Sequence, residues 1–172
     1  MLPADFLSEI SRDGFSICHG ALSLSDVVAL RDSLQSIGAA SGVYGLRNLL
    51  QRSPTIRAAA NSPHIKELVT AVLGPEARAV RAILFDKQPG ANWGVGWHQD
   101  LTIAVKQRIE TGGFSAWTVK DDVPHVQSPV EILERMLTLR LHLDAADEHN
   151  GALLVMPGTH ARSPAGDLGG VR

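Results

Sequence analysis

Apolar and polar positions divide the chain into a helical first part and a strand-like second part. In residues 23–38 apolar side chains recur at helical spacing, and Ser23 stands where it can cap the first turn. Residues 62–75 repeat this pattern, with Pro63 as the first helical residue. A third, short helix is predicted over residues 3–10. The apolar faces of such helices usually pack into a core.

After residue 75 the pattern becomes typical of strands. The clearest case is residues 137–144, where leucines alternate with Thr138, Arg140 and His142. A turn is predicted at residues 89–92. Strands are predicted at residues 14–22, 77–88, 96–105, 137–144 and 152–158. Since helices come first and antiparallel-looking strands follow without βαβ alternation, the sequence predicts a mainly β core with flanking helices, which is an α+β protein.

A short helical turn is also predicted at residues 128–136, where Ser128 and Glu131 have the spacing of a capping box. The length of 172 residues suits one domain. Within it we expect a helical part over residues 1–75, a strand core over 76–160 and a flexible tail over 161–172.

The amino-acid composition narrows the range of functions that the chain could have. The chain is 44% hydrophobic and 20% charged, as in folded proteins, and its net charge of −2 without a basic run gives no support for a nucleic-acid or membrane-surface role. Cys18 is the single cysteine, which excludes an internal disulfide and a cysteine-based zinc cluster. No signal peptide and no membrane-length apolar run is found, so we expect a cytoplasmic protein.

The candidate chemistry begins at His98-Gln99-Asp100. In an extended strand, residues i and i+2 point to one face, so an imidazole and a carboxylate would project together. They would be two of the three ligands in the two-His-one-carboxylate triad that binds non-heme iron. A lone His-x-Asp pair is a weak signal, and simple packing is the competing interpretation. Downstream, His160 is by residue type the candidate for a third ligand.

Two longer stretches, "FDKQPGANWGVGWHQD" and "HLDAADEHNGALLVMPGTH", resemble the phytanoyl-CoA dioxygenase family of Fe(II)/2-oxoglutarate-dependent oxygenases. The stretch "DGFSICHGALSLSDVVALRDSL" is similar to the family's opening strand and helix, so the likeness covers residues 6–160. It implies a double-stranded β-helix, or jelly roll, with flanking helices. It also implies that 2-oxoglutarate and O2 yield succinate and CO2 while a C–H bond of a small-molecule substrate is hydroxylated.

The resemblance also implies roles for single residues. His98 and Asp100 would be iron ligands, and Arg140 would face the pocket of the 2-oxoglutarate cosubstrate. Further residues would lie at or near the substrate pocket, namely Trp97, Thr102, Trp117, His125 and Gln127. Nothing in the loop before residue 128 identifies the substrate, and the lack of a basic patch argues against coenzyme A.

The chain departs from the family pattern after His160. The family's distal histidine and the basic residue for 2-oxoglutarate come from later strands, whereas "ARSPAGDLGGVR" has neither a histidine nor a strand pattern. We therefore expect a C-terminally incomplete jelly roll that self-associates through exposed strand edges. The alternative is a truncated, non-catalytic remnant. A general cupin-like binding module would need further His or Glu ligands close to His98, and the sequence has none there.

Overall fold

The chain folds as a mixture of helices and antiparallel sheets. A computed structural model describes residues 2–38, 45–86, 94 and 96–162. The chain divides into two compact units, one of Met1–Trp93 with Thr138–Ala161 and the other of Gly94–Leu137 with Arg162–Arg172. This arrangement confirms the predicted α+β class, and the described residues form no barrel. The predicted turn at residues 89–92 lies outside the described residues.

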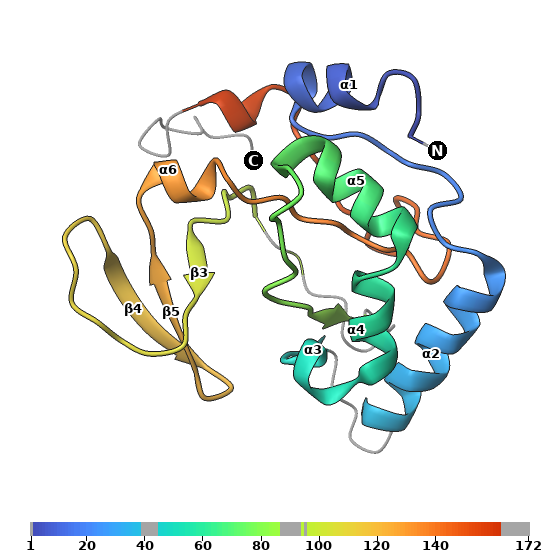
Figure 1. The fold of residues 1–172 in the computed structure, drawn as a ribbon, viewed down its shortest axis with the longest axis horizontal. Coiled ribbons are helices and arrows are strands. Elements are labelled where there is room, and N and C mark those ends of the chain that lie inside the picture. The colour runs from blue at the N-terminus through green and yellow to red at the C-terminus, as the bar shows by residue number, and fades with distance from the viewer. Residues whose placement is uncertain (1, 39–44, 87–93, 95, 163–172) are drawn as a thin grey trace. The chain divides into compact units, whose positions relative to one another are not determined.

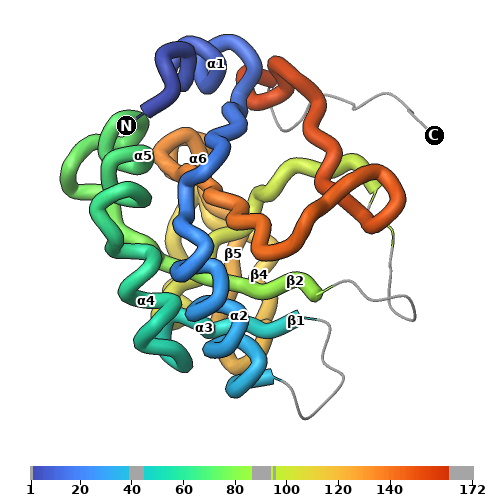
Figure 2. The backbone as a smooth tube through the Cα atoms, turned by 90° about the vertical axis from the view of Figure 1, so that its right-hand side faces the viewer, coloured from blue at the N-terminus to red at the C-terminus, as the bar shows by residue number. Residues whose placement is uncertain are grey.

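The first unit is mainly helical. Its described elements are α1 (Phe6–Asp13), α2 (Leu24–Gly38), β1 (Gly45–Leu46), α3 (Leu49–Arg52), α4 (Pro54–Ala60), α5 (Pro63–Leu73), β2 (Leu84–Phe85) and the 3-10 turn Thr159–Ala161. β1 and β2 pair antiparallel beside α3 and α4 (Figure 2). Two small cores hold the unit together, one around Leu30 and Leu49 and the other around Phe6 and Leu68. None of the described helices has the length and apolar character needed to cross a bilayer.

The capped helix predicted from Ser23 is confirmed as α2. Ser23 Oγ accepts a hydrogen bond from Asp26 N at 3.1 Å, and Asp26 Oδ2 accepts from Ser23 N at 3.2 Å and from Ser23 Oγ at 2.6 Å. These reciprocal bonds satisfy N–H groups that a helix start otherwise leaves open. They also hold the pKa of Asp26 below its ordinary value, chiefly through the side-chain bond from Ser23.

Ser23→Ala is expected to lower the free energy of unfolding by about 1 kcal/mol at pH 7, because the cap of α2 is lost. The lowered pKa of Asp26 adds stability that is present above the unfolded carboxyl value of about 4 and is lost as the pH falls through the lower folded value. The difference between variant and wild type should therefore shrink between pH 7 and pH 3. Urea unfolding at both pH values measures it. Ser36→Ala, an exposed change later in α2, is the control and should leave stability nearly unchanged.

Several predicted strands are wrong. Residues 14–22, 137–144 and 152–158 form no strand, and of residues 77–86, the described part of the strand predicted over residues 77–88, only Leu84–Phe85 pairs. Alternation makes one face apolar, but a strand also needs a neighbour to take its backbone hydrogen bonds. In residues 152–158 that neighbour is absent from the described structure, and the side chain of Leu154 stays 71% exposed.

The second unit contains a three-stranded antiparallel sheet in the order β3-β5-β4 (Figure 1). Its strands are β3 (Thr102–Ala104), β4 (Ser115–Lys120) and β5 (Val123–Gln127). A two-residue turn joins β4 to β5, and both turn residues, Asp121 (φ 48°) and Asp122 (φ 61°), have the positive φ of a type I′ turn. Since β3 and β4 both run antiparallel to β5, the connection over residues 105–114 returns from one end of the sheet to the other.

A short helix, α6 (Val130–Leu133), follows β5. The predicted helical turn is thus confirmed, but its capping box is wrong. The residue before the helix is Pro129, and Ser128 instead continues the β5 ladder through its N–H, which donates to the carbonyl of Leu101 at 3.3 Å. Its buried hydroxyl has no partner among the described residues.

Candidate metal centre

His98 and Asp100 lie just before β3, not within a strand as predicted. Their facing atoms are nevertheless near each other, since His98 Nε2 is 3.9 Å from Asp100 Oδ1. This separation is too long for a hydrogen bond. The side chains are 55% and 78% exposed, so the pair is open to solvent and to a ligand. The second unit therefore presents a nitrogen and a carboxylate oxygen side by side.

The backbone fixes which ring nitrogen of His98 is available. The Gly96 carbonyl lies 2.8 Å from His98 Nδ1. A carbonyl can only accept, so Nδ1 carries the proton, and in the neutral ring the lone pair is on Nε2. Metal-binding histidines in proteins usually have their second nitrogen held in this way. The donor set therefore fits one edge of a divalent metal site.

Distance alone does not distinguish this pair from others in the chain. His149 Nε2 is 3.5 Å from Glu148 Oε1, and His64 Nδ1 is 3.9 Å from Glu67 Oε2. The His98 pair differs because the Gly96 carbonyl orients its ring. In the other two pairs the histidine ring bonds no backbone carbonyl of the residues that the structure describes. This makes them suitable controls.

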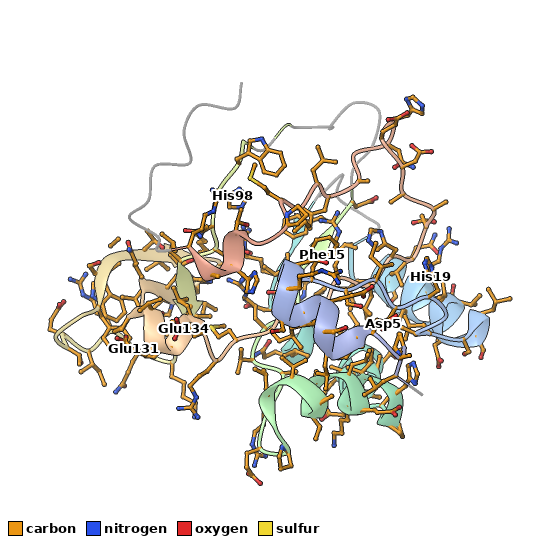
Figure 3. The ribbon with its side chains drawn as sticks, turned by 90° about the horizontal axis from the view of Figure 1, so that it is seen from above. Asp5, Phe15, His19, His98, Glu131 and Glu134 are labelled. Atoms are coloured by element: carbon orange, nitrogen blue, oxygen red, sulfur yellow. The ribbon has the colours of Figure 1, made fainter. Side chains whose placement is uncertain are left out.

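A third ligand is not present among the described residues, where no group of three His, Cys, Asp or Glu side chains could hold a metal. In the same unit as His98, Glu131 and Glu134 lie well apart from it (Figure 3). His160, the candidate from the sequence, belongs to the first unit. There its ring packs against the end of α1, within 2.6 Å of where a Cβ on Gly14 would stand.

Arg140 also belongs to the first unit. Its side chain is exposed and forms no ion pair with any residue that the structure describes, so its guanidinium is available to a carboxylate. The predicted strand that would aim it into a pocket is not formed. Its role toward 2-oxoglutarate stays a prediction.

The predicted substrate residues lie on two different faces of the β3-β5-β4 sheet. Residues paired across strands share a face, and neighbours along a strand alternate. Thr102 pairs with Gln127, and Thr118 pairs with His125, so these side chains point to one side. Trp117, next to Thr118, points to the other side. The structure thus groups His125 and Gln127 but separates Trp117 from them.

His125 is the buried polar residue of this sheet, at 3% exposure. Its Nδ1 lies 2.9 Å from the carbonyl of Val123, so Nδ1 donates and the neutral ring keeps an acceptor at Nε2. The ladder ends at Leu101, whose carbonyl accepts a hydrogen bond from Ser128 N, and Asp100 lies one residue further along, outside the strand.

Sequence reasoning missed two features of this unit. One is the Gly96 carbonyl that orients His98, and a glycine two residues before a histidine is too common to signal it. The other is a cleft of about 470 Å³ on the Trp117 side, lined in part by Lys106, Phe114 and Val126. Gly112 and Gly113 are typical of a loop, but they do not show that this loop returns over the sheet.

Helices beside antiparallel sheets, with an oriented His and Asp pair at the start of a strand, define an α+β protein with a candidate metal centre. Comparison with known families is more specific: the family model "Phytanoyl-CoA dioxygenase (PhyH)" matches residues 10–167, and the chain belongs to this family. Membership suggests oxygenase activity at the level of the family. No curated protein and no solved structure matched the chain significantly.

Proposed function

We propose that the chain is an Fe(II)/2-oxoglutarate-dependent dioxygenase that hydroxylates a small molecule. The observation that carries this proposal is the His98–Asp100 pair, in which the Gly96 carbonyl holds Nδ1 and leaves Nε2 facing the carboxylate. Membership in the dioxygenase family supports it. A jelly-roll core belongs to the proposal and is supported by the antiparallel β3-β5-β4 sheet.

In this proposal His98 and Asp100 hold the iron. The lone pair of Nε2 and the negative charge of Asp100 are donors that Fe(II) accepts in mixed nitrogen and oxygen sites. Fe(II), when bound, supplies the O2 activation that couples conversion of 2-oxoglutarate into succinate and CO2 to hydroxylation of a C–H bond. The Gly96 carbonyl keeps His98 in the required tautomer. The role of Arg140 toward a carboxylate of 2-oxoglutarate stays a prediction, for which a planar guanidinium is chemically suited.

His125 and Gln127 are assigned to substrate binding, because both side chains lie on one face of the β3-β5-β4 sheet, in the same unit as Asp100. With Nδ1 committed to Val123, His125 offers an acceptor at Nε2, and the Gln127 amide offers both a donor and an acceptor. A hydroxyl or N–H group on the substrate would match them. Trp117, which faces the other side of the sheet, is assigned to a different site below.

Anaerobic calorimetry of Fe(II) binding to the full chain, with and without 2-oxoglutarate, tests the proposal. The wild type should bind Fe(II) and bind it more tightly with 2-oxoglutarate, which chelates the same ion. His98→Ala and Asp100→Ala should each weaken Fe(II) binding more than about tenfold, since changes in residues that only support a ligand already cost that much.

His149→Ala is the matched control. It removes a histidine that is 84% exposed and also stands beside a carboxylate, but lacks the orienting backbone carbonyl. It should leave Fe(II) affinity unchanged. Equal binding by wild type and His98→Ala, or binding indifferent to 2-oxoglutarate, would remove the basis of the proposal.

A further inference from the structure

The connection between β3 and β4 encloses a cleft on the sheet face opposite to His125 and Gln127. Residues 105–114 return along the sheet, and their side chains meet those of β4 and β5 around a space of about 470 Å³. This volume lies within the range of small-molecule pockets, roughly 300–1,000 Å³. Its described walls include Val105, Lys106, Ile109, Phe114, Trp117 and Val126.

The side chains that line the cleft suit a ligand with a compact apolar or aromatic part. Val126 is among the lining residues and is itself completely buried. Two aromatic rings, those of Phe114 and Trp117, stand at the wall, and aromatic pairs favour offset or edge-on contact with a third ring. The Trp117 Nε1–H is a buried donor without an acceptor among the described residues. Such orphans are rare in folded proteins, and a ligand that brings an acceptor to this N–H would satisfy it.

The charge at the cleft favours an anion. Lys106 lines it and forms no ion pair with any residue that the structure describes. The neighbouring cation, Arg108, is already engaged. Its Nε donates to Glu110 Oε1 at 2.6 Å, and its guanidinium carbon lies 5.4 Å from the centre of the Trp117 ring. No acidic side chain is among the described lining residues, so an entering carboxylate meets Lys106 without competition.

We propose that this cleft binds a small carboxylate with an apolar body of about one aromatic ring. The site is distinct from the His98–Asp100 pair, because neither residue is among the described lining residues of the cleft, and it lies on the sheet face opposite to His125 and Gln127. The proposal does not depend on iron binding or on the proposed dioxygenase activity, and each can fail alone.

The test uses the full chain and two probes of equal shape, 3-phenylpropionate and its uncharged amide. Proton–nitrogen NMR spectra resolve the three indole N–H signals of Trp93, Trp97 and Trp117, and Trp117→Phe assigns the last. Titration with 3-phenylpropionate should shift the Trp117 signal in a saturable way and leave the other two in place. The amide should bind about fivefold more weakly than the acid, since one exposed ion pair contributes up to about that factor.

Lys106→Met keeps the length of the side chain and removes its charge. It should lower the affinity for the acid about fivefold and leave that for the amide unchanged. Lys120→Met, at the end of β4 in the same unit but outside the described lining of the cleft, is the matched control and should bind both probes like the wild type. Added salt should weaken the binding of the acid and leave the binding of the amide unchanged. An unmoved Trp117 signal, equal binding of acid and amide, or an unchanged affinity in Lys106→Met would each overturn the proposal.

Discussion

Replacing His98 by alanine is expected to reduce succinate formation from 2-oxoglutarate at least about a hundredfold. The variant loses the Nε2 donor that faces Asp100, and one carboxylate with water holds Fe(II) weakly. Succinate released in air, with Fe(II) and a reductant but no added substrate, measures the slow uncoupled reaction. The assay therefore works before the substrate is known.

Two comparisons make this result specific. His149→Ala should form succinate at the wild-type rate, because its ring and Glu148 lie on an exposed turn of the other unit. Circular dichroism should show that His98→Ala keeps its fold, since the exposed ring holds no core together. If His98→Ala and wild type form succinate equally fast, His98 is not an iron ligand.

The second large effect concerns stability. Gly14→Ala is expected to lower the free energy of unfolding by about 2–4 kcal/mol. Gly14 ends α1 with φ +84°, which costs a residue with a side chain about 1–2 kcal/mol. The new methyl group would also stand 2.6 Å from His160 Cγ and force the ring away from the end of the helix. Denaturant unfolding followed by circular dichroism measures the loss.

Gly20→Ala separates the two causes. Gly20 also has a positive φ, +68°, but nothing lies within 4 Å of its added methyl group, so only the backbone cost applies. The difference between the two variants reports the contact with His160. That difference should disappear when both are made in a His160→Ala background. If it persists, residues 158–160 do not dock on α1 as described.

The helices α2 and α5 were predictable because their signals are local, whereas α3 and α4 were not predicted. Ser23 and Asp26, or Pro63 and Gly74, lie close in sequence and fix the start and end of a helix without reference to distant residues. Strands were not predictable in the same way. Residues 137–144 show the best alternation in the chain but form no strand, since a strand also requires a partner that the alternation does not name.

The approach of His98 and Asp100 was predicted from the sequence, but the geometry that brings them together differs from the predicted strand. His98 and Asp100 do approach each other, but in an irregular segment whose geometry comes from the Gly96 carbonyl. The separation of Trp117 from His125 could not be read from their spacing. It follows from the two-residue turn at Asp121-Asp122, which fixes the register, and from the irregularity near Ala116, where φ is 51°.

The order of strands in the second unit bears on how it folds and opens. β4 and β5 close through two residues and form a hairpin from local contacts, on a scale of about microseconds. β3 can pair with β5 only once the two ends of the connection over residues 105–114 are fixed in place. In the folded sheet, β5 is the strand that forms hydrogen bonds with β3 along one edge. We therefore expect β3 to open first in native-state hydrogen exchange. A ligand that bridges residues 105–114 and the hairpin would slow this opening, and with it the exchange of the strand that directly follows His98 and Asp100.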